Sequence, residues 1–478
     1  MLRRTKIVAT LGPASERPET LEKMIGAGLN VARLNFSHGS ADEHRARAGA
    51  VRAAAEKCGS VVGVMGDLQG PKIRIRRFRN GSVELADGQP FFLDSAFEAA
   101  GGSEEGVAVA LETLHEDVCP GDVLLLNDGM ITLRVDRVEG TRIHTIVVNG
   151  GTLSDNKGIN KQGGGLSAPA LTDVDRENIK LAAELQIDFL AVSFVRNGDD
   201  VMEARRLFEE AGGTGRIVAK IERTEAVDNI DSIVEAADVI MVARGDLGVE
   251  MGYAPLTGIQ KNLIRKTRKR SKVVITATQM MESMLEHPIP TRAEVSDVSN
   301  AVMDGTDAVM LSGETAVGKF PVKAIRAMSE VCLGAEQFPL PEGMTRHRIG
   351  DYFKRVDEAI AMAVMYTANH LDVQAIFALT ESGSTALWMS RIRSDIPIFA
   401  FTPHQATSRR VTLYRGVTPI LFDTTTTDSR ALYQDVFDLM LEKGYVKVGD
   451  SVIFTKGDLD GVSGSTNAMK IVEVTARS

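Results

Sequence analysis

Residues 238–250, DVIMVARGDLGVE, form an apolar run that breaks abruptly into charge. The run from Val239 to Ala243 predicts a buried strand, and Arg244, Gly245 and Asp246 follow at its end. The tripeptide Arg-Gly-Asp is also an adhesion signal when it lies on an exposed loop of a secreted protein. The other strands of the chain distinguish these two interpretations.

The same unit of a short apolar run, a polar break and a helical pattern recurs along the chain. The expected strands are 6–12, 30–36, 61–67, 187–195, 216–222, 238–244, 272–278 and 307–313. Eight strands alternating with helices are what a (β/α)8 TIM barrel requires, and such barrels carry their active sites at the carboxyl ends of the strands. We therefore predict this barrel, with a doubly wound open sheet as the alternative.

The repeat is interrupted once, between the third and fourth expected strands. Residues 71–167 are alternating runs separated by Gly, Asn and Asp turns, which predicts a small all-β domain inserted into the barrel. An insertion at this point would stand beside the strand ends and could close over them as a lid. The barrel domain would then comprise residues 1–70 and 168–337.

A further domain is expected after a Pro- and Gly-bearing connector at 338–352. Short strands alternate with helices again over residues 353–478, which predicts a smaller open α/β domain at the carboxyl end. A chain of 478 residues is too long for one ordinary core, so several domains agree with its length.

The composition narrows the class of protein. The formal charge of −9 and the lack of a basic block argue against a nucleic-acid-binding protein. Three scattered cysteines offer neither a disulfide framework nor a zinc site. No signal peptide is evident and no stretch approaches the roughly 20 apolar residues of a membrane span, so we expect a cytoplasmic protein. That expectation disfavours the adhesion interpretation.

Polar residues end nearly every expected strand. They are Arg33, Asn35 and Ser37; Asp67; Ser193; Lys220 and Glu222; Arg244 and Asp246; Thr278; and Ser312 and Glu314. Any one of them would ordinarily be a helix cap or a surface residue. In a parallel barrel, however, all of these ends lie on one rim, so we expect the side chains to gather there.

Two carboxylates and two cations define the chemistry expected at this rim. Glu222 and Asp246 end neighbouring strands, so their oxygens can share one Mg²⁺ while water and substrate complete its shell. Lys220 lies two residues before Glu222 and therefore points to the same side of the strand. With Arg33 facing them, the pocket would suit a phosphate ester or carboxylate, and phosphoryl transfer requires such positive charge.

Six motifs make the chain resemble the pyruvate kinase family over essentially its whole length. They are VARLNFSHGS, GDLQGPKIR, VAKIERTEAV, VARGDLGVE, ITATQMMESM and PTRAEVSDVSNAVMDGTDAVMLSGETAVGKFP. The resemblance implies a barrel, a lid, an effector-binding carboxyl-terminal domain and a homotetramer. The implied reaction is phosphoryl transfer from phosphoenolpyruvate to ADP, giving pyruvate and ATP, with Mg²⁺ as the metal and Mn²⁺ as the alternative.

The resemblance also assigns roles to residues, which remain expectations at this point. It implies that Glu222 and Asp246 hold the metal, that Lys220 and Arg33 contact the phosphoryl group, and that the Gly245 and Asp246 amides hold the substrate carboxylate. Thr278 and Ser312 would help to protonate the enolate. The positions that match nucleotide contacts are Asn35, His38, Arg74 and Lys157, and Ser193, Phe194 and Glu314 match supporting positions.

Lys72 and Gln69 depart from the K⁺-requiring members of the family, which typically have Glu and Lys at these positions. The monovalent-cation site otherwise uses Asn35, Ser37 and Asp67, all of which are present. A lysine ammonium is a compact single positive charge and could occupy the place of K⁺. We therefore expect no K⁺ requirement.

The effector segment differs from members activated by fructose 1,6-bisphosphate. It offers a cradle for one phosphate: Thr380, Ser382, Gly383, Ser384 and Thr385. Glu381 and Asp458 would repel a second phosphate, so we expect a sugar monophosphate or AMP as regulator. A helix-capping loop without a ligand is the alternative.

The nearest enzymatic rival is another Mg²⁺-dependent, enolate-handling barrel of the aldolase or lyase type. Such an enzyme would need neither the lid nor Lys157. An Arg-Gly-Asp adhesion module is the rival outside enzymes, and it would require an exposed tripeptide.

Overall fold

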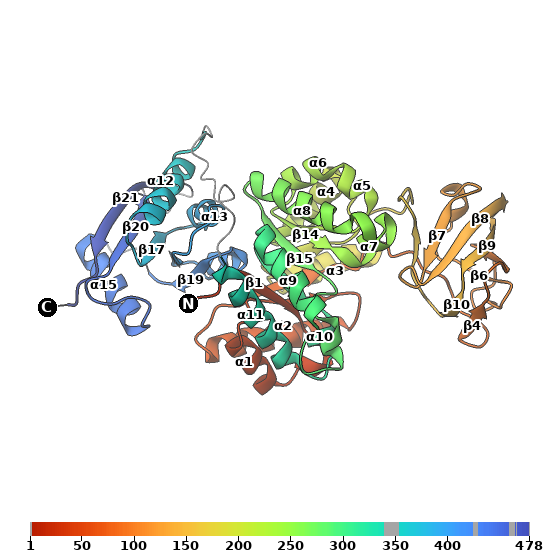
Figure 1. Ribbon diagram of the computed structural model, residues 1–478, viewed down its shortest axis with the longest axis horizontal. Helices are drawn as coiled ribbons and strands as arrows, with labels where there is room; N and C mark the ends of the chain where they lie inside the picture. Colours follow the sequence, from red (N-terminus) through yellow and green to blue (C-terminus); the bar gives the residue numbers. More distant parts are fainter. Residues whose placement is uncertain (1, 339–352, 424–428, 458–463, 465, 478) are drawn as a thin grey trace.

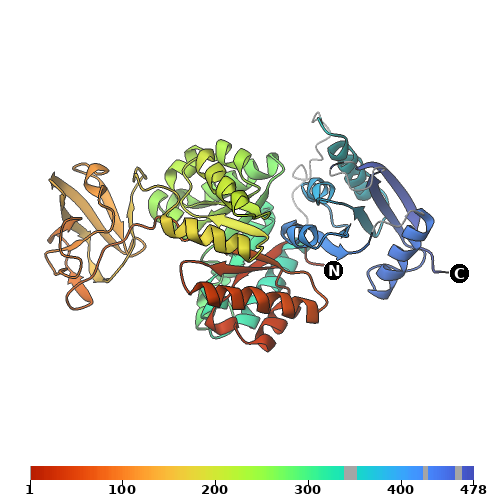
Figure 2. The same ribbon diagram turned by 180° about the vertical axis from the view of Figure 1, so that it is seen from behind.

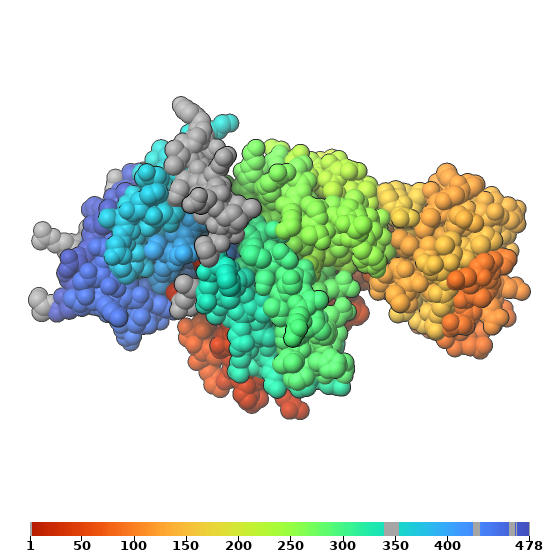
Figure 3. Space-filling view, viewed as in Figure 1, coloured from red at the N-terminus to blue at the C-terminus, as the bar shows by residue number. Residues whose placement is uncertain are grey.

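The computed structural model describes residues 2–338, 353–423, 429–457, 464 and 466–477. Three bodies lie in a row along the molecule: a β-rich module, a central barrel and a carboxyl-terminal α/β domain (Figure 1). The β-rich module joins the barrel through a narrow neck (Figure 3). Residues 339–352 of the expected connector lie outside the described residues. Within these ranges, no helix is long and apolar enough to cross a membrane.

The central body is a closed barrel of eight parallel strands, as predicted, and the open-sheet alternative is wrong. Around the barrel the order is β1-β16-β15-β14-β13-β12-β3-β2. The strands are β1 (Lys6–Thr10), β2 (Val31–Asn35), β3 (Gly63–Asp67), β12 (Phe189–Val192), β13 (Arg216–Ile221), β14 (Val239–Ala243), β15 (Val273–Ala277) and β16 (Ala308–Leu311). All eight lie within the predicted runs.

Helices cover the outside of the barrel and bury the outward-facing side chains of the strands. They are α1 (Pro18–Gly26), α2 (Ala41–Lys57), α3 (Asp173–Glu184), α4 (Gly198–Glu210), α5 (Thr224–Asp228), α6 (Ile230–Ala236), α7 (Arg244–Met251), α8 (Tyr253–Lys269), α9 (Arg292–Asp304), α10 (Gly313–Ala316) and α11 (Pro321–Gln337). Side chains alternate along each strand, so Ile217, Ala219 and Ile221 pack on the helices while Val218 and Lys220 point into the barrel.

The β-rich module lies between β3 and α3 and has its own apolar core. Its strands are β4 (Ser82–Leu85), β5 (Pro90–Asp94), β6 (Gly106–Ala108), β7 (Val123–Leu126), β8 (Ile131–Glu139), β9 (Arg142–Asn149), β10 (Gly151–Ser154) and β11 (Ile159–Lys161). Six of them form one sheet in the order β11-β7-β8-β9-β5-β6, and β10 pairs with β4 in a second, two-stranded sheet.

The carboxyl-terminal domain is a five-stranded sheet in the order β19-β18-β17-β20-β21, with only β21 antiparallel. Its elements are α12 (Val356–His370), β17 (Ala375–Leu379), α13 (Ser384–Ser390), β18 (Ile398–Thr402), α14 (Gln405–Arg410), β19 (Val417–Leu421), α15 (Ser429–Glu442), β20 (Ser451–Gly457) and β21 (Thr466–Glu473). This is the open α/β domain expected from the sequence.

The carboxyl-terminal domain closes the amino-terminal end of the barrel (Figures 1 and 2). Inward-facing barrel residues such as Val8 and Met241 share one buried apolar cluster with Met389 and Leu413 of the domain. Apolar burial of this kind stabilises the contact at about 25 cal/mol per Å². The two bodies therefore share part of one core.

Buried polar contacts surround this shared core. Arg391 of the carboxyl-terminal domain donates from Nη1 to Oδ2 of Asp307, which precedes β16, over 2.9 Å, and both side chains are almost completely buried. Lys6 Nζ donates to the Val417 carbonyl over 2.5 Å, and burial lowers the pKa of Lys6 to about 7. Removing one partner of a buried pair usually costs more than an exposed pair contributes, so these contacts fix how the domain docks.

Candidate active site

The carboxyl ends of β2, β3 and β13 bring two cations onto one buried carboxylate. Asp67 is completely buried; its Oδ2 accepts from Arg33 Nε over 2.6 Å, and its Oδ1 lies 3.2 Å from Lys220 Nζ. Burial alone would raise the pKa of Asp67, but the adjacent Arg33 and Lys220 cations outweigh it and lower that pKa. Asp67 is therefore ionised and holds both cations in place.

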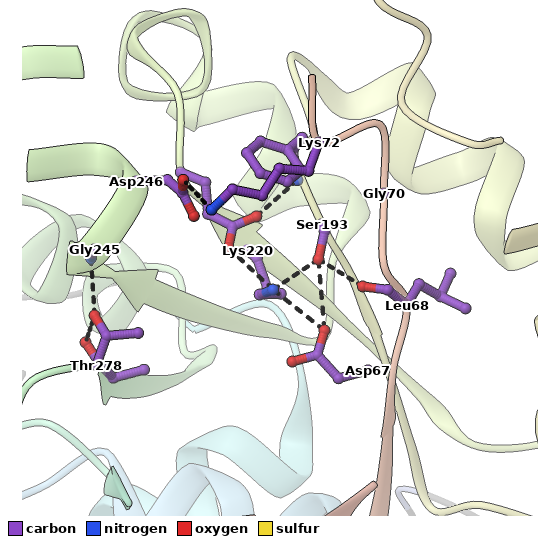
Figure 4. A network of polar contacts seen from close by, with 12 residues as sticks. Asp67, Leu68, Gly70, Lys72, Ser193, Lys220, Gly245, Asp246 and Thr278 are labelled. Atoms are coloured by element: carbon purple, nitrogen blue, oxygen red, sulfur yellow. Dashed lines mark hydrogen bonds and ion pairs between the residues drawn. The ribbon is translucent and has the colours of Figure 1, made fainter. Parts of the chain in front are cut away.

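Lys220 is the charged centre of this rim. Its Nζ lies 3.0 Å from Glu222 Oε1 and donates to Ser193 Oγ over 2.6 Å; Figure 4 shows it between Ser193 and Asp67. Burial works to lower the pKa of Lys220, but Asp67 and Glu222 outweigh it and raise that pKa. The side chain is therefore an ammonium group held at a fixed position inside the barrel mouth.

Glu222 and Asp246 are the residues whose oxygen atoms could hold a metal. Glu222 Oε2 accepts from the Phe194 amide over 2.9 Å, which orients the carboxylate. Burial raises the pKa of Glu222, and the nearby Asp246 and Asp67 carboxylates raise it further against the opposing effect of Lys220. A divalent cation would relieve this accumulation of negative charge. Two carboxylates with room for water and substrate oxygens suit Mg²⁺.

This donor set is small. Among the described residues, no group of three or more His, Cys, Asp or Glu side chains could hold a metal. A cation at Glu222 and Asp246 would therefore take its remaining ligands from water or from a bound substrate, which agrees with the preference of Mg²⁺ for retaining several such ligands.

Arg244 ties the end of β14 to the end of β15. It is 8% exposed, and its guanidinium donates to the Ala277 carbonyl over 3.3 Å, to the Thr278 carbonyl over 2.8 Å and to Asp297 Oδ1 over 2.7 Å. Arg244 also begins α7, so the Arg-Gly-Asp tripeptide lies in a helix and not on an exposed loop. The adhesion interpretation is therefore wrong.

The β14 and β15 ends meet directly at Thr278. The Gly245 amide donates to Thr278 Oγ1 over 2.8 Å, and Figure 4 shows this contact beside Asp246. Thr278 adopts a φ of 69°, an unusual left-handed conformation for a β-branched residue. Ser312, at the end of β16, is held differently: its amide donates to Glu314 Oε2 over 2.7 Å.

The expected nucleotide residues fall into two groups. Asn35 is the Cα partner of Asp67 across β2 and β3, and the His38 amide donates to the Asn35 carbonyl over 3.2 Å. Arg74 and Lys157 lie instead on paired segments at the base of the β-rich module, where Arg74 donates to the Asn156 carbonyl over 2.9 Å. No hydrogen bond or ion pair of the described residues joins this second group to the rim.

Lys72 contacts Asp246, one of the two carboxylates expected to hold a metal. Its Nζ donates to Asp246 Oδ1 over 3.0 Å and lies 3.6 Å from Asp128 Oδ1 of the module (Figure 4 shows the Asp246 contact). No hydrogen bond or ion pair among the described residues connects it to Asn35, Ser37 or Asp67. The physical reason is charge: Asp67 already holds two cations, whereas Asp246 and Glu222 are not balanced in this way.

Two supporting residues were not predicted. Thr10 ends β1 and accepts from Arg33 Nη1 over 2.8 Å, so it orients the guanidinium that faces Lys220. Thr10 is a polar residue near the end of the expected strand 6–12, so the rule applied to the other strand ends could have found it. Glu250 gave no such signal, because it lies in α7 and not at a strand end.

Glu250 lies where the β-rich module meets the barrel. It is 3% exposed; its Oε2 accepts from the Thr224 amide over 3.0 Å, and its Oε1 lies 3.4 Å from Asn160 Nδ2 of the module. The Gly163 amide, at the exit of the module, donates to the Glu250 carbonyl over 3.1 Å. Burial raises the pKa of Glu250 to about 7.

The expected effector segment turns sharply at Gly383, whose φ is 84° and whose amide donates to Thr380 Oγ1 over 2.9 Å. The Thr385 and Thr466 hydroxyls lie 2.6 Å apart, and Ser384 Oγ lies 3.5 Å from Asp357 Oδ2. Glu381 Oε2 is 2.5 Å from His404 Nε2. Ser382 follows Glu381 in this turn, and Asp458 lies outside the described residues.

Comparisons with known proteins agree with this arrangement. Residues 2–325 match the family model described as "Pyruvate kinase, barrel domain", and residues 358–472 match "Pyruvate kinase, alpha/beta domain". The chain is 54% identical to pyruvate kinase II of Salmonella typhimurium over 99% of both chains. It is 51% identical to the pyruvate kinase of Haemophilus influenzae, covering 95% of this chain and 96% of that one. It is 44% identical to the Geobacillus stearothermophilus enzyme over 98% of this chain and 80% of the relative.

Because Glu250 is buried, we expect the stability of the folded chain to depend on pH. The pKa of about 7 lies above the ordinary value of 4.5, so the folded state favours the neutral acid. The contribution of the neutral Glu250 side chain to the free energy of unfolding is fully present below pH 4.5 and is lost as the pH rises through 7. Glu250→Gln should therefore raise the melting temperature relative to the parent chain at pH 8 but not at pH 5, as measured by calorimetry. Glu177→Gln, at a side chain 72% exposed, is the control and should leave the melting temperature unchanged at both pH values. Equal melting temperatures of parent and Glu250→Gln at pH 8 would contradict the prediction.

Proposed function

The chain belongs to the pyruvate kinase family, and we propose on this premise that it transfers the phosphoryl group of phosphoenolpyruvate to ADP, giving pyruvate and ATP. The observation that carries the proposal is the Lys220 ammonium, fixed by Asp67 and Glu222 beside Arg33 at the barrel rim. This reaction is the ATP-forming last step of glycolysis. The comparisons do not favour the aldolase or lyase alternative.

Lys220 and Arg33 supply the positive charge that phosphoryl transfer needs. Phosphoenolpyruvate carries a phosphoryl group and a carboxylate, and negative charge shifts between phosphoryl oxygens as the group is transferred. Both cations are anchored by Asp67 before substrate arrives, so they need little reorganisation during the reaction. We assign Lys220 to the transferring group and Arg33 to its other oxygens.

Glu222 and Asp246 would hold the divalent cation, for which Mg²⁺ is the first choice and Mn²⁺ the second. When bound, such a cation polarises the substrate oxygens that it ligates and neutralises their charge. Phe194 keeps Glu222 oriented through its amide, and Arg244 keeps the start of α7, and thus Asp246, in place. These contacts pre-form the oxygen pair from the protein side.

Substrate orientation and protonation would use the β14 and β15 ends. The Gly245 and Asp246 amides lie at the start of α7, where backbone N–H groups and the helix dipole favour a carboxylate. The Thr278 hydroxyl lies 2.8 Å from the Gly245 nitrogen, beside that carboxylate position. We propose that Thr278, with Ser312 and water, delivers the proton that converts the enolate into pyruvate.

The β-rich module would act as a lid over the nucleotide. Asn35 and His38 lie on the rim and Arg74 and Lys157 on the module, so both sides would contact the ADP phosphates only when the module approaches the barrel. Closure excludes water from the reacting groups. We further propose a cytoplasmic homotetramer, in keeping with the family resemblance.

The assigned roles of Lys220 and Asp246 predict different defects. Asp246→Ala should abolish turnover because the metal loses a carboxylate. Lys220→Met should reduce phosphoryl transfer by about 10²–10³-fold while Mn²⁺ binding and proton exchange on pyruvate persist. A lactate-dehydrogenase-coupled assay, Mn²⁺ titration and deuterium exchange measure the three properties. Lys57→Met, at a side chain 70% exposed, is the control. Parent-like phosphoryl transfer in Lys220→Met would refute the assignment.

Turnover should not require K⁺. Lys72 places a positive charge at Asp246, and Asp67 is already neutralised by Arg33 and Lys220. We expect equal rates in Na⁺-free buffers that contain either K⁺ or tetramethylammonium. Lys72→Glu should lose activity in tetramethylammonium and recover part of it with K⁺. A parent enzyme that is inactive until K⁺ is added would contradict this prediction.

The segment 380–385 is proposed to bind one phosphate of a sugar monophosphate or AMP. Its Glu381 would repel a second phosphate, so calorimetric titration should show weaker binding of fructose 1,6-bisphosphate than of glucose 6-phosphate or AMP. Glu381→Lys should narrow or reverse this difference. Tight bisphosphate binding by the parent chain would overturn the proposal.

A further inference from the structure

A cavity of about 470 Å³ lies between the amino-terminal end of the barrel and the carboxyl-terminal domain. This is the end of the barrel opposite the strand-end site, where Figures 1 and 2 place the chain's amino terminus. Arg4 and Arg268 line it from the barrel side, and Arg393 and Arg415 line it from the domain side. The cavity is therefore a pocket formed by both bodies, distinct from the catalytic rim and from segment 380–385.

The lining carries more positive than negative charge. Among the described residues, the lining has four arginines and two carboxylates, Glu336 and Asp395. Glu336 accepts from the Arg4 amide over 2.9 Å and lies 3.6 Å from Arg415 Nη2. Asp395 bonds Arg4 and is 77% exposed. Arg4 thus engages both carboxylates, and Arg415 lies beside Glu336.

Arg268 and Arg393 have no carboxylate partner among the described residues. Arg268 donates to the Gly305 and Arg391 carbonyls over 2.6 and 3.1 Å, and Arg393 donates to the Met303 carbonyl over 2.7 Å. Two acidic side chains that act on them form their ion pairs elsewhere: Asp304 Oδ1 with Lys261 and Asp307 with Arg391, whereas Asp304 Oδ2 has no hydrogen-bond partner among the described residues. The two guanidinium groups that line the pocket therefore form no direct ion pair, and Asp307 and Asp304 offset their charge only from a distance.

These two cations are also held close to each other. A Cβ placed on Gly305 would stand 2.9 Å from Arg393 Nη2 and 3.3 Å from Arg268 Nε, so both guanidinium groups converge on this glycine. Burial lowers the pKa of Arg268 to about 9, and the neighbouring Arg391, Arg415 and Arg393 cations add to the effect against the opposing influence of Asp307. An anion between the two arginines would relieve both the burial penalty and the repulsion.

We propose that this cavity binds a small phosphate monoester, held by Arg268 and Arg393. The guanidinium fork matches phosphate oxygens in a bidentate manner, and a dianion would balance the two unpaired cations. The volume lies within the range of small-molecule pockets. Val302, Met303 and Ile392 provide an apolar wall for the carbon skeleton of the ester.

Binding at this place would join the two bodies. Arg268 belongs to α8 of the barrel, whereas Arg393 follows α13 of the carboxyl-terminal domain. The bound phosphate would thus add a bridge beside the shared apolar core. Ligand should therefore raise the melting temperature of the full chain as well as being detectable by calorimetric titration.

The test uses glycerol 3-phosphate as the probe, with inorganic phosphate and succinate for comparison. Glycerol 3-phosphate should bind the full chain, and Arg393→Gln should weaken this binding about tenfold or more, with Arg393→Lys intermediate. The parent-like turnover of Arg393→Gln would show that the variant is folded. Arg477→Gln, at an arginine 66% exposed, and Ser384→Asp, which blocks segment 380–385, should bind the probe as the parent does.

Three results would overturn the proposal. The first is that glycerol 3-phosphate does not bind the parent chain, or that the Ser384→Asp substitution abolishes all of the binding that the parent shows. The second is equal affinity of the parent and Arg393→Gln. The third is tighter binding of succinate than of glycerol 3-phosphate, which would assign the pocket to dicarboxylates. Binding of inorganic phosphate that Arg393→Gln abolishes would support the assignment of the phosphate group.

Discussion

Closure of the barrel is the constraint on which the rest of the structure depends. Because all eight strands are parallel and joined edge to edge, their carboxyl ends meet on one rim and their amino ends on the other. Residues distant in the sequence, such as Arg33, Asp67 and Lys220, become neighbours as a result. At the opposite rim, the carboxyl-terminal domain packs its apolar side chains against the inward-facing residues of the barrel. The polar strand-end site and the docking face of the carboxyl-terminal domain therefore lie at opposite ends of the barrel.

Charge balance at the rim formed by the carboxyl ends of the strands depends on a single buried carboxylate. Asp67 holds Arg33 by a hydrogen bond and, with Glu222, raises the pKa of Lys220 against the effect of burial. The remaining carboxylates, Glu222 and Asp246, are left with less compensation, and Lys72 supplies part of it. A site with fixed cations on one side and under-compensated carboxylates on the other suits an anionic substrate held together with a divalent cation.

Regular elements were the most predictable part of the molecule. All eight barrel strands lie within predicted apolar runs, because burial on both faces demands such runs, and polar residues at their ends identified the rim. Pairing inside the β-rich module could not be predicted, since alternation gives strands but not their order. The contact of Lys72 with Asp246 was not predicted, because side-chain reach between the β-rich module and the barrel depends on competing charges. Glu250 gave no local signal, as its burial arises only when module and barrel meet.

The shared core between the barrel and its neighbour has a consequence for how such a chain can diverge. Val8 and Met241 on one side and Met389 and Leu413 on the other are parts of the same apolar cluster. A change on one side that alters volume must be matched on the other, because close packing tolerates few voids. The docking face of the carboxyl-terminal domain and the amino-terminal end of the barrel are therefore coupled, so a substitution in one is best tolerated together with a compensating substitution in the other.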